Sequence, residues 1–338
     1  MVSEEVVTLA HGSGGVETLR LVEELIAPRF KYKDYKGGIG LRELDDGATI
    51  PLNGFNLVIS TDSYTVEPIF FPGGDIGKLA VTGSINDVVV MGAKPIVILD
   101  SIVVEEGFPL SYLRRILDSM AEVANREGVA LVGGDFKVMP RGKVDRIIIS
   151  TTCVGLVKRL ITDAGLKVGD KLVISGTIAE HGAAILAAQM GMEVKGGLLS
   201  DCAPLTKLME IALEVGGVTA AKDLTRGGLA SALNEMARKS GVTVRIKEEL
   251  IPIRNAVRRY SEMLGVDPLI LASEGRALLG VEAKKAEELV RELRMRGFKD
   301  ATVIGEVVGK GGKVLLETSV GGLRPLEPPS GEIVPRIC

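Results

Sequence analysis

Four aspartates lie in segments that could bring carboxylates together around a divalent cation. Asp46 is in DDGA, Asp62 ends the run LVISTD, Asp87 is in SINDVVVMGA, and Asp135 is in GGDFK after an apolar run. Magnesium binds hard oxygen ligands, usually one or two carboxylates together with substrate phosphates. Each aspartate by itself could instead be a helix cap, a turn residue or a solvated charge. The set as a whole favours metal binding, because Gly-rich motifs occur in the same segments.

These Gly-rich stretches differ from the standard phosphate-binding motifs. In GGDIGKL only three residues separate Gly73 from Gly77, and Leu79 stands where a P-loop requires Ser or Thr. HGSGGVE has Glu17 where a dinucleotide fingerprint requires Gly. A Gly-rich loop before a helix can still bind phosphate through backbone N–H groups. Because a carboxylate 4 Å from a phosphate charge costs about 4 kcal/mol at an effective dielectric constant of 20, aspartates beside phosphates require metal ions between them.

The end of the chain is rich in proline and terminates in a cysteine. Four of the residues from 325 to 338 are Pro, which excludes a helix and predicts a stiff extended arm of up to roughly 45 Å. The thiol of Cys338 is mostly protonated at neutral pH, and the neighbouring α-carboxylate should raise its pKa while Arg336 opposes this. Such a thiol is a poor nucleophile but suits a carrier role. A terminal cysteine without a function is the alternative.

Two further ionisable residues and the two histidines are candidates for a role in catalysis or metal binding. Lys137 follows Asp135 in GGDFKV, where a surface lysine is an equally good interpretation, and Glu274 is in LASEGRALL. His11 and His181 are the only histidines, so a His-rich metal site is excluded. Each histidine is more typical of a hydrogen-bonded structural residue than of a base.

Composition limits the classes of protein to which the chain can belong. Its 338 residues, 46% of them hydrophobic, suit two domains and exclude a largely disordered chain. A net charge of −3, with 4% aromatic residues and no Trp, argues against binding to nucleic acid or to an anionic membrane surface. Three cysteines without CxxC spacing, no secretory signal and no apolar run near 20 residues predict a cytoplasmic protein.

Alternating strand and helix patterns must position these residues. The first half has strand patterns over 57–61, 95–103 and 146–157, and helix patterns over 76–91, with Asp75 as N-cap, and 110–126. Beyond a junction at 158–172, strands are predicted over 171–175, 276–281 and 302–308, and helices over 182–190, 203–215, 228–240, 254–264 and 284–296. The pattern predicts an α/β protein with mixed α+β sheets.

Four segments follow from this division of the chain. A Gly-rich segment, 1–42, precedes an N-terminal α/β domain, 43–157. A C-terminal α/β domain, 158–323, follows, and a mobile Pro-rich tail, 324–338, carries Cys338 at its end.

Several motifs taken together resemble one family. HGSGG, STDSYTVEPIFFPGGDIGKLAVTGSINDV, GGDFKV, KDLTRGG and the terminal PRIC are similar to the hydrogenase maturation factor family HypE. That family belongs to the ATP-binding superfamily of aminoimidazole ribonucleotide synthetase, selenophosphate synthetase and thiamin-monophosphate kinase. The resemblance covers essentially the whole chain and implies a two-domain aminoimidazole ribonucleotide synthetase-like fold with a flexible C-terminal tail. One departure is Phe136, where a small polar residue such as Thr is expected.

The resemblance implies ATP-dependent dehydration of a group on the protein's own tail. A carbamoyltransferase of the HypF type would place a carbamoyl group on the Cys338 thiol. ATP would phosphorylate the carboxamide oxygen, and loss of phosphate would leave a thiocyanate. The cyano group would then pass to a HypC–HypD scaffold and on to the iron of a [NiFe]-hydrogenase.

The resemblance also implies that 1–42 contains a lid loop, that 43–157 binds ATP and dimerises, and that the homodimer shares its site. Lys137 and Glu274 would act in deprotonation of the group on Cys338. The magnesium ligands would be Asp46, in preference to Asp45, with Asp62, Asp87 and Asp135. The ATP-binding residues would be His11, Gly12, Ser13, Gly14, Gly15, Lys78, Asn86, Gly133, Gly134, Asp223 and Thr225, with Asp223 also close to the metal.

Two other functions remain open from the sequence. A small-molecule kinase or synthetase of the same superfamily is one, although Leu9, Ala10 and His11 offer no reactive Cys of the selenophosphate synthetase kind, and a thiamin-phosphate kinase would not need PRIC. The other is a non-catalytic, ATP-gated adaptor whose tail is a docking peptide.

Overall fold

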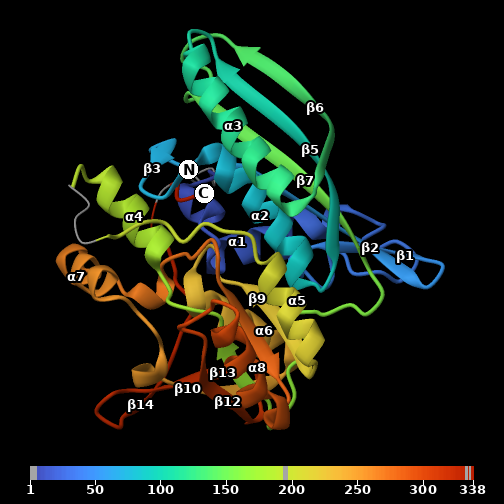
Figure 1. Cartoon of the computed structure of the whole chain (residues 1–338), viewed down its shortest axis with the longest axis vertical. Helices are drawn as coiled ribbons and strands as arrows, with labels where there is room; N and C mark the ends of the chain where they lie inside the picture. Colours follow the sequence, from blue (N-terminus) through green and yellow to red (C-terminus); the bar gives the residue numbers. More distant parts are fainter. Residues whose placement is uncertain (1–5, 193–196, 332–333, 335) are drawn as a thin grey trace, which may run out of the picture.

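The first sheet of the computed structural model has five strands and is covered on one face by two helices (Figure 1). Its strands, in spatial order, are β1 (Ala48–Leu52), β2 (Phe55–Tyr64), β7 (Ile147–Val157), β5 (Lys94–Glu105) and β6 (Ala130–Met139). The β5–β6 pair is parallel and the other neighbours are antiparallel. The helices are α2 (Ile76–Val90) and α3 (Leu110–Glu127). The structure describes residues 6–192, 197–331, 334 and 336–338.

The second sheet has seven strands and belongs to the C-terminal half. Their spatial order is β14 (Leu323–Pro325), β13 (Lys313–Glu317), β10 (Val242–Lys247), β12 (Thr302–Lys310), β8 (Lys171–Ile174), β11 (Ala277–Val281) and β9 (Val218–Asp223). Helix α8 (Ala283–Met295) contacts β8 and β12, and α5 (Thr206–Val215) packs on α8. Helix α6 (Gly228–Ser240) contacts β9, β10 and β13.

Short elements connect and flank the two sheets. Strands β3 (Phe70–Phe71) and β4 (Gly74–Asp75) form a ribbon. The remaining helices are α1 (Val16–Arg20), α4 (Glu180–Gln189) and α7 (Asn255–Leu264), and the single turns or short helices are η1 (Leu9–Gly12), η2 (Leu21–Ile26), η3 (Ala27–Arg29), η4 (Glu248–Leu250) and η5 (Pro268–Ile270).

Helix α2 joins the two halves because it is apolar nearly all round. Within it only Lys78 and Asp87 are not buried, and it contacts β2, β7 and α3 on one side and β9 and α5 on the other. A helix without a polar face must be enclosed on every side. Asp75 begins the helix as predicted, and its Oδ1 accepts hydrogen bonds from the backbone N–H groups of Gly77 (2.9 Å) and Lys78 (3.0 Å).

The predicted fold class is confirmed: mixed sheets and helices form two α/β parts. The structure also contains strands that were not predicted, namely β1, β3, β4, β6, β9, β10, β13 and β14. Strand β6 includes the pair Gly133–Gly134, and glycine lacks the side chain that normally signals a strand. The exact segment boundaries at residues 43, 158 and 324 stay a prediction.

The end of the chain lies between the two halves, as the C label in Figure 1 shows. After β14 the chain runs past Gly15, where the carbonyl oxygen of Pro329 is close to the glycine backbone. The backbone N–H of Gly331 donates to the carboxylate of Glu17 at 3.3 Å. Pro335 lies outside the described residues. Cys338 is half-buried.

A candidate active site at the chain terminus

A cavity of about 220 Å³ lies where β2, α2 and β9 meet. It brings together residues that are distant in sequence, from the Gly-rich loop to the last residue. Its lining residues are Gly14, Asp46, Asp62, Ser63, Tyr64, Gly83, Asp87, Lys222, Asp223, Thr225, Arg226, Glu235, Glu274 and Cys338. Most of the carboxylates that the sequence singled out therefore share one site with the terminal thiol. Asp46 lines it and Asp45 does not.

The carboxylates of the cavity repel one another in a poorly hydrated environment. Burial raises the pKa of Asp223 to about 8, and the charge of Asp46 adds to this effect. Burial also raises the pKa of Asp87 well above its ordinary value, with Asp62 as the next cause, and that of Glu274, with Asp223 as the next cause. The hydroxyl of Ser60 donates to Asp87 Oδ2 at 2.6 Å. A bound cation would relieve this repulsion.

Lys222 is the cation that the protein itself places against this cluster. Its Nζ donates to Asp46 Oδ1 and lies 3.3 Å from Glu235 Oε2 and 3.7 Å from Asp163 Oδ2. Burial alone would lower the pKa of Lys222, but these carboxylates, Asp46 above all, raise it well above its usual value. The ion pairs join the DDGA loop to β9, so they connect the two halves of the molecule.

Three carboxylate oxygens of the cavity are available as ligands for a magnesium ion. Asp46 Oδ2, Asp223 Oδ2 and Glu274 Oε1 are buried, and none has a hydrogen-bond partner within the described part of the chain. Such oxygens are costly unless a ligand satisfies them. Among the described residues no three His, Cys, Asp or Glu groups lie close enough together to hold a metal by themselves. This set fits magnesium bound by one or two carboxylates and completed by phosphates.

The thiol of Cys338 lies among ionisable groups. Burial raises its pKa to about 12, the charge of Arg226 opposes this rise, and Glu274 adds to it. The sequence indicated Arg336 as the opposing cation, but Arg336 pairs instead with Glu67 (4.0 Å) and Asp145. In this position the thiol is therefore neutral and weakly nucleophilic.

The Gly-rich loop closes against Arg226. Gly14 has a φ of +77°, and a Cβ there would lie 2.5 Å from Arg226 Cβ, so only glycine allows this approach. Arg226 Nη1 donates to the carbonyl oxygen of Gly12 at 3.0 Å. Gly12 and Ser13 line a second cavity on the other side of Cys338, and Gly15 lies under the tail. His11 is turned toward Thr8, whose backbone N–H donates to Nδ1 at 3.0 Å.

Several predicted residues lie outside the cavity. Gly133, Gly134, Asp135 and Lys137 are on β6, which is exposed along its whole length, and Lys137 Nζ lies 2.6 Å from Asp135 Oδ2. Within this chain they do not join the other candidates. Their roles stay predictions.

Asn86 and Lys78 make local structural contacts. Asn86 Nδ2 donates to the carbonyl oxygens of Ala203 (3.3 Å) and Glu274 (3.2 Å), so it fixes the loop that carries Glu274. Lys78 Nζ donates to the carbonyl oxygen of Gly73 at 2.9 Å. Thr225 lines the cavity, where its hydroxyl lies 3.4 Å from Asp223 Oδ1.

Lys222, Arg226 and Tyr64 were not predicted as site residues. Lys222 and Arg226 are in the motif KDLTRGG, where the basic residues flanking Asp223 were the available signal. Tyr64 reaches the site because Gly83 is small: a Cβ on Gly83 would lie 2.0 Å from the Tyr64 hydroxyl. That hydroxyl lies 3.4 Å from Asp62 Oδ2.

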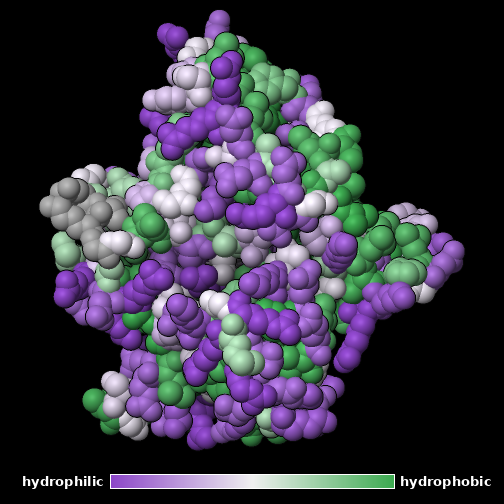
Figure 2. Space-filling model, viewed as in Figure 1, coloured by the Kyte–Doolittle hydropathy of each residue, from purple (hydrophilic) through white to green (hydrophobic). Residues whose placement is uncertain are grey.

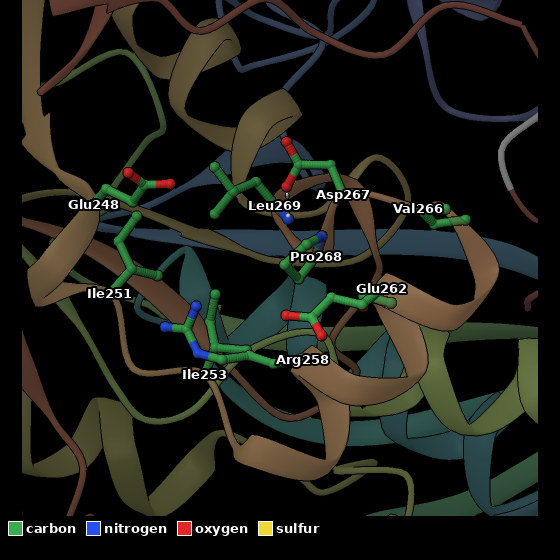
Figure 3. Close-up of a pocket in the computed structure, with 11 residues that line it drawn as sticks. Glu248, Ile251, Ile253, Arg258, Glu262, Val266, Asp267, Pro268 and Leu269 are labelled. Carbon is green, nitrogen blue, oxygen red and sulfur yellow. Dashed lines mark hydrogen bonds between the residues drawn. The ribbon is translucent and has the colours of Figure 1, made fainter. Parts of the chain in front are cut away.

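A cavity of about 350 Å³ beside α7 and η5 is a poor candidate (Figure 3). Figure 3 shows its charged side chains, including Arg258, Glu262 and Glu248, spread around a depression that also contains Ile251 and Leu269. None of the predicted site residues lines it, and Arg258 and Glu262 are exposed.

Comparisons with known proteins identify first the class and then the family. A model of the N-terminal domain of AIR synthase related proteins matches residues 44–157, and the corresponding C-terminal domain model matches residues 167–317. The chain thus has the two-domain architecture of AIR synthase related proteins.

Relatives and solved structures narrow this class. A putative hydrogenase expression/formation protein of Methanocaldococcus jannaschii is 43% identical over 98% of this chain and 99% of its own length. A carbamoyl dehydratase HypE of Cupriavidus necator is 41% identical over 98% and 95%. A HypE–HypF complex contains a chain with a TM-score of 0.85 and 39% identity, covering 91% of this chain and 99% of that one. A HypE bound to ATP has a TM-score of 0.81 and 38% identity, covering 98% and 100%. The chain belongs to the HypE family of hydrogenase maturation proteins.

No helix in the described part of the chain is both long enough and apolar enough to cross a membrane.

Proposed function

We propose that this chain catalyses the ATP-dependent dehydration of a carbamoyl group carried by the thiol of Cys338. The observation that carries the proposal is the position of the last residue, whose side chain lines one cavity with Glu274, Asp87 and Asp223. The chain places its own terminus beside buried carboxylates that suit metal and phosphate binding. The carbamoyl dehydratase name of a relative, and the complex of another with ATP, support the same activity.

The proposed reaction balances without an oxidant or reductant. The S-carbamoyl group, S–C(=O)–NH₂, loses its oxygen and both N–H protons and becomes a thiocyanate, S–C≡N. ATP supplies a phosphoryl group to the carboxamide oxygen, which leaves in phosphate, so the products are ADP, phosphate and the thiocyanate. The protein must therefore hold the carbamoyl group against the nucleotide and accept protons from its nitrogen.

Glu274 is the residue of this protomer that best suits proton transfer. It is 2% exposed, its Oε1 has no hydrogen-bond partner in the described part of the chain, and it lines the cavity with Cys338. Burial and the charge of Asp223 raise its pKa well above the ordinary value, so its carboxylate form is a stronger base than that of a solvated glutamate. Its backbone N–H donates to Asp201 Oδ1 at 3.0 Å, so the side chain starts from a fixed backbone.

Magnesium and ATP would be held around the same cavity. Asp46 and Asp223 have the unpartnered oxygens for the metal, and Asp62 and Asp87 line the cavity beside them. Arg226 and the Gly-rich loop supply a positive charge and backbone N–H groups for phosphates. The bound nucleotide would supply the phosphoryl group that turns the carboxamide oxygen into a leaving group.

A homodimer would complete the site. Strand β6 is an open sheet edge with exposed apolar side chains, namely Leu131, Val132, Phe136, Val138 and Met139. Figure 2 shows hydrophobic surface along the upper right edge, where Figure 1 places β6. Open apolar edges are ordinarily covered by pairing with another strand. A second copy paired there would bring the Asp135 and Lys137 of one protomer toward the other.

The partners follow the same proposal. A HypF-type carbamoyltransferase would load Cys338, as the HypE–HypF complex of the relative supports, and a HypC–HypD scaffold would receive the cyano group for the hydrogenase iron. These steps would take place in the cytoplasm. The tail would leave the cavity for loading and delivery and return for dehydration.

The test follows the mass of the tail. The purified chain is incubated with the carbamoyl donor system, magnesium and ATP, and the C-terminal peptide is analysed by mass spectrometry. We expect the carbamoylated peptide to lose the mass of one water in an ATP-dependent step. Cys338→Ser should abolish both modifications while ATP binding, measured by calorimetry, stays within about twofold. Glu274→Gln should accept the carbamoyl group but slow its dehydration at least 100-fold, the usual contribution of a general base.

Two matched variants serve as controls. Cys153→Ala removes another buried thiol and Glu248→Gln a half-buried carboxylate outside the site, and both should dehydrate at the normal rate. An unmodified tail in the wild-type protein, with tight ATP-dependent binding to the partners, would support the adaptor instead. Phosphorylation of an added small molecule without a change at Cys338 would support a kinase.

A further inference from the structure

The buried histidine of the C-terminal half contacts the end of the tail. His181 lies in the first turn of α4 and is 0% exposed. Its Nδ1 is 2.7 Å from Ser200 Oγ, and its Nε2 is 2.8 Å from the carbonyl oxygen of Ile337. Phe71 packs edge-on against the imidazole, with ring centroids 5.5 Å apart and an interplanar angle of 89°. The ring is therefore fixed on three sides.

The hydrogen-bond chain determines which nitrogen of His181 carries the proton. The backbone N–H of Cys202 donates to Ser200 Oγ at 3.1 Å, which leaves the hydroxyl hydrogen free to donate to His181 Nδ1. A carbonyl oxygen can only accept, so Nε2 must carry hydrogen and donate to Ile337. Every polar atom of the imidazole is satisfied in the neutral Nε2–H tautomer.

The contact with Ile337 completes the docking of residues 336–338, which we call the docked terminus. The backbone N–H of Thr65 donates to the carbonyl oxygen of Cys338 at 3.0 Å, and that of Glu67 to the carbonyl oxygen of Arg336 at 3.1 Å. These two bonds attach the carbonyl groups of Cys338 and Arg336 to residues 65–67. The carbonyl group of Ile337, which lies between them in the chain, has His181 as its partner.

We propose that His181 is a positioning residue that holds the docked terminus by the backbone carbonyl of Ile337, so that Cys338 stays in the cavity. The inference rests on the proposed function for its purpose, because docking is the state in which the group on Cys338 would be dehydrated. Recognition of a backbone carbonyl is independent of the side chain of Ile337. It also leaves the Cys338 thiol free to carry a substituent.

The position of His181 suits it to hold the docked terminus and does not suit it to act as an acid–base catalyst. His181 does not line the cavity that contains Glu274, and both of its ring nitrogens have partners. Burial lowers its pKa, so the imidazole stays neutral and the Nε2–H bond persists across the neutral pH range. If His181 is absent, the carbonyl group of Ile337, a residue that is 8% exposed, loses the hydrogen-bond partner that it has among the described residues. Docking must then compete with solvation of that carbonyl by water.

The first measurement is the rate at which iodoacetamide alkylates Cys338 in the full-length protein without ATP. Mass spectrometry of the C-terminal peptide separates Cys338 from the buried Cys153 and Cys202. We expect His181→Ala to raise the rate about tenfold, the effect of one lost hydrogen bond on an opening equilibrium. His181→Gln, which can place an amide N–H near the position of Nε2, should restore most of the protection. Ser200→Ala, which loosens the ring, should give an intermediate rate.

The second measurement is hydrogen exchange at the backbone N–H groups of Thr65 and Glu67. These groups donate to the docked terminus, so their exchange reports release of the tail independently of thiol ionisation. Exchange at both should accelerate in His181→Ala to the same extent as alkylation. Ser261→Ala is the matched control for Ser200→Ala, because Ser261 is also a buried serine but lies in α7. It should change neither rate.

The outcomes separate this inference from the proposed function. A folded His181→Ala protein with wild-type alkylation and exchange rates would overturn the role of His181, whatever the tail chemistry is. A wild-type tail that is never dehydrated would instead overturn the proposed function and leave the docking result standing. When both hold, His181→Ala should lower the dehydration rate constant while the affinity for ATP is unchanged.

Discussion

At the scale of single residues, the site contains several carboxylates whose charges repel one another and are only partly compensated by nearby cations. Asp46, Asp87, Asp223 and Glu274 would each be costly in a buried position, and their repulsion is incompletely balanced by Lys222 and Arg226. An arrangement that stores repulsion while it is empty is suited to bind a cation. Structural stability and ligand affinity are therefore linked through the same few atoms.

Lys222 gives a direct test of this link. Its side chain is 12% exposed, and its removal would leave Asp46 buried without its cation, whereas Asp163 would keep its ion pair with Lys239. We expect Lys222→Met to lower the free energy of unfolding by about 3–5 kcal/mol, measured by urea denaturation without metal. Lys171→Met, which removes a half-exposed partner of Glu306, should cost at most about 1 kcal/mol.

A double variant identifies the cause of the loss. If the unpaired carboxylate is responsible, Asp46→Asn should recover part of the stability lost in Lys222→Met. Equal destabilisation of the single and the double variant would contradict this explanation and indicate a packing defect instead.

At the scale of elements, α2 and β6 have opposite environments. Helix α2 is enclosed, and its half-buried Asp87 lines the cavity. Strand β6 is an unpaired edge on which predicted site residues and exposed apolar residues occur together. The first element fixes one part of the site within the protomer, and the second indicates that another part requires a second copy.

The proposed dimer edge can be tested with one charged substitution. Phe136 is 49% exposed on β6, and Phe136→Lys would place a charge in the apolar contact between copies. We expect the dissociation constant of the dimer to rise at least tenfold in analytical ultracentrifugation, because a buried unpaired charge is costly. Leu110→Lys, at a residue that is 77% exposed at the start of α3, should leave association unchanged. A wild-type protein that is monomeric at all concentrations would refute the dimer.

At the scale of the whole molecule, the carboxylates link stability to pH. The pKa of Asp223 is raised from 3.8 to about 8 and that of Asp45 to about 7, in both cases chiefly by burial. In the folded state these groups keep their protons at pH values where the unfolded chain has lost them. Their contribution to stability is therefore fully present below pH 3.8 and is lost as the pH rises through 7 and 8.

The predicted consequence is a stability that falls toward alkaline pH. Between pH 6 and 8 the metal-free protein should lose on the order of 4 kcal/mol in its free energy of unfolding, measured by urea denaturation. Asp223→Asn should flatten this dependence, and magnesium with ATP should reduce it. A wild-type profile that is flat or rises over this interval would show that these carboxylates are already ionised in the folded protein.

The sequence by itself determined the local elements and the chemical types at the site. The strand patterns around 57–61 and 146–157, the Asp75 cap and the apolar run of α2 are encoded within a few residues, and the structure reproduces them. The motifs also identified Asp46, Asp62, Asp87, Asp223, Glu274 and Cys338, which share one cavity. Such features can be predicted from the sequence because backbone propensity and the chemical type of a side chain are local properties.

Only the tertiary structure decided which of these residues meet. Lys222 lies against Asp46, and Arg226 rather than Arg336 lies near Cys338. His181 bonds to the carbonyl oxygen of Ile337, and Asp135 and Lys137 lie on an exposed sheet edge. Each of these contacts joins segments far apart in the chain. Their formation depends on how whole sheets and helices pack, and no pattern of neighbouring residues specifies that packing.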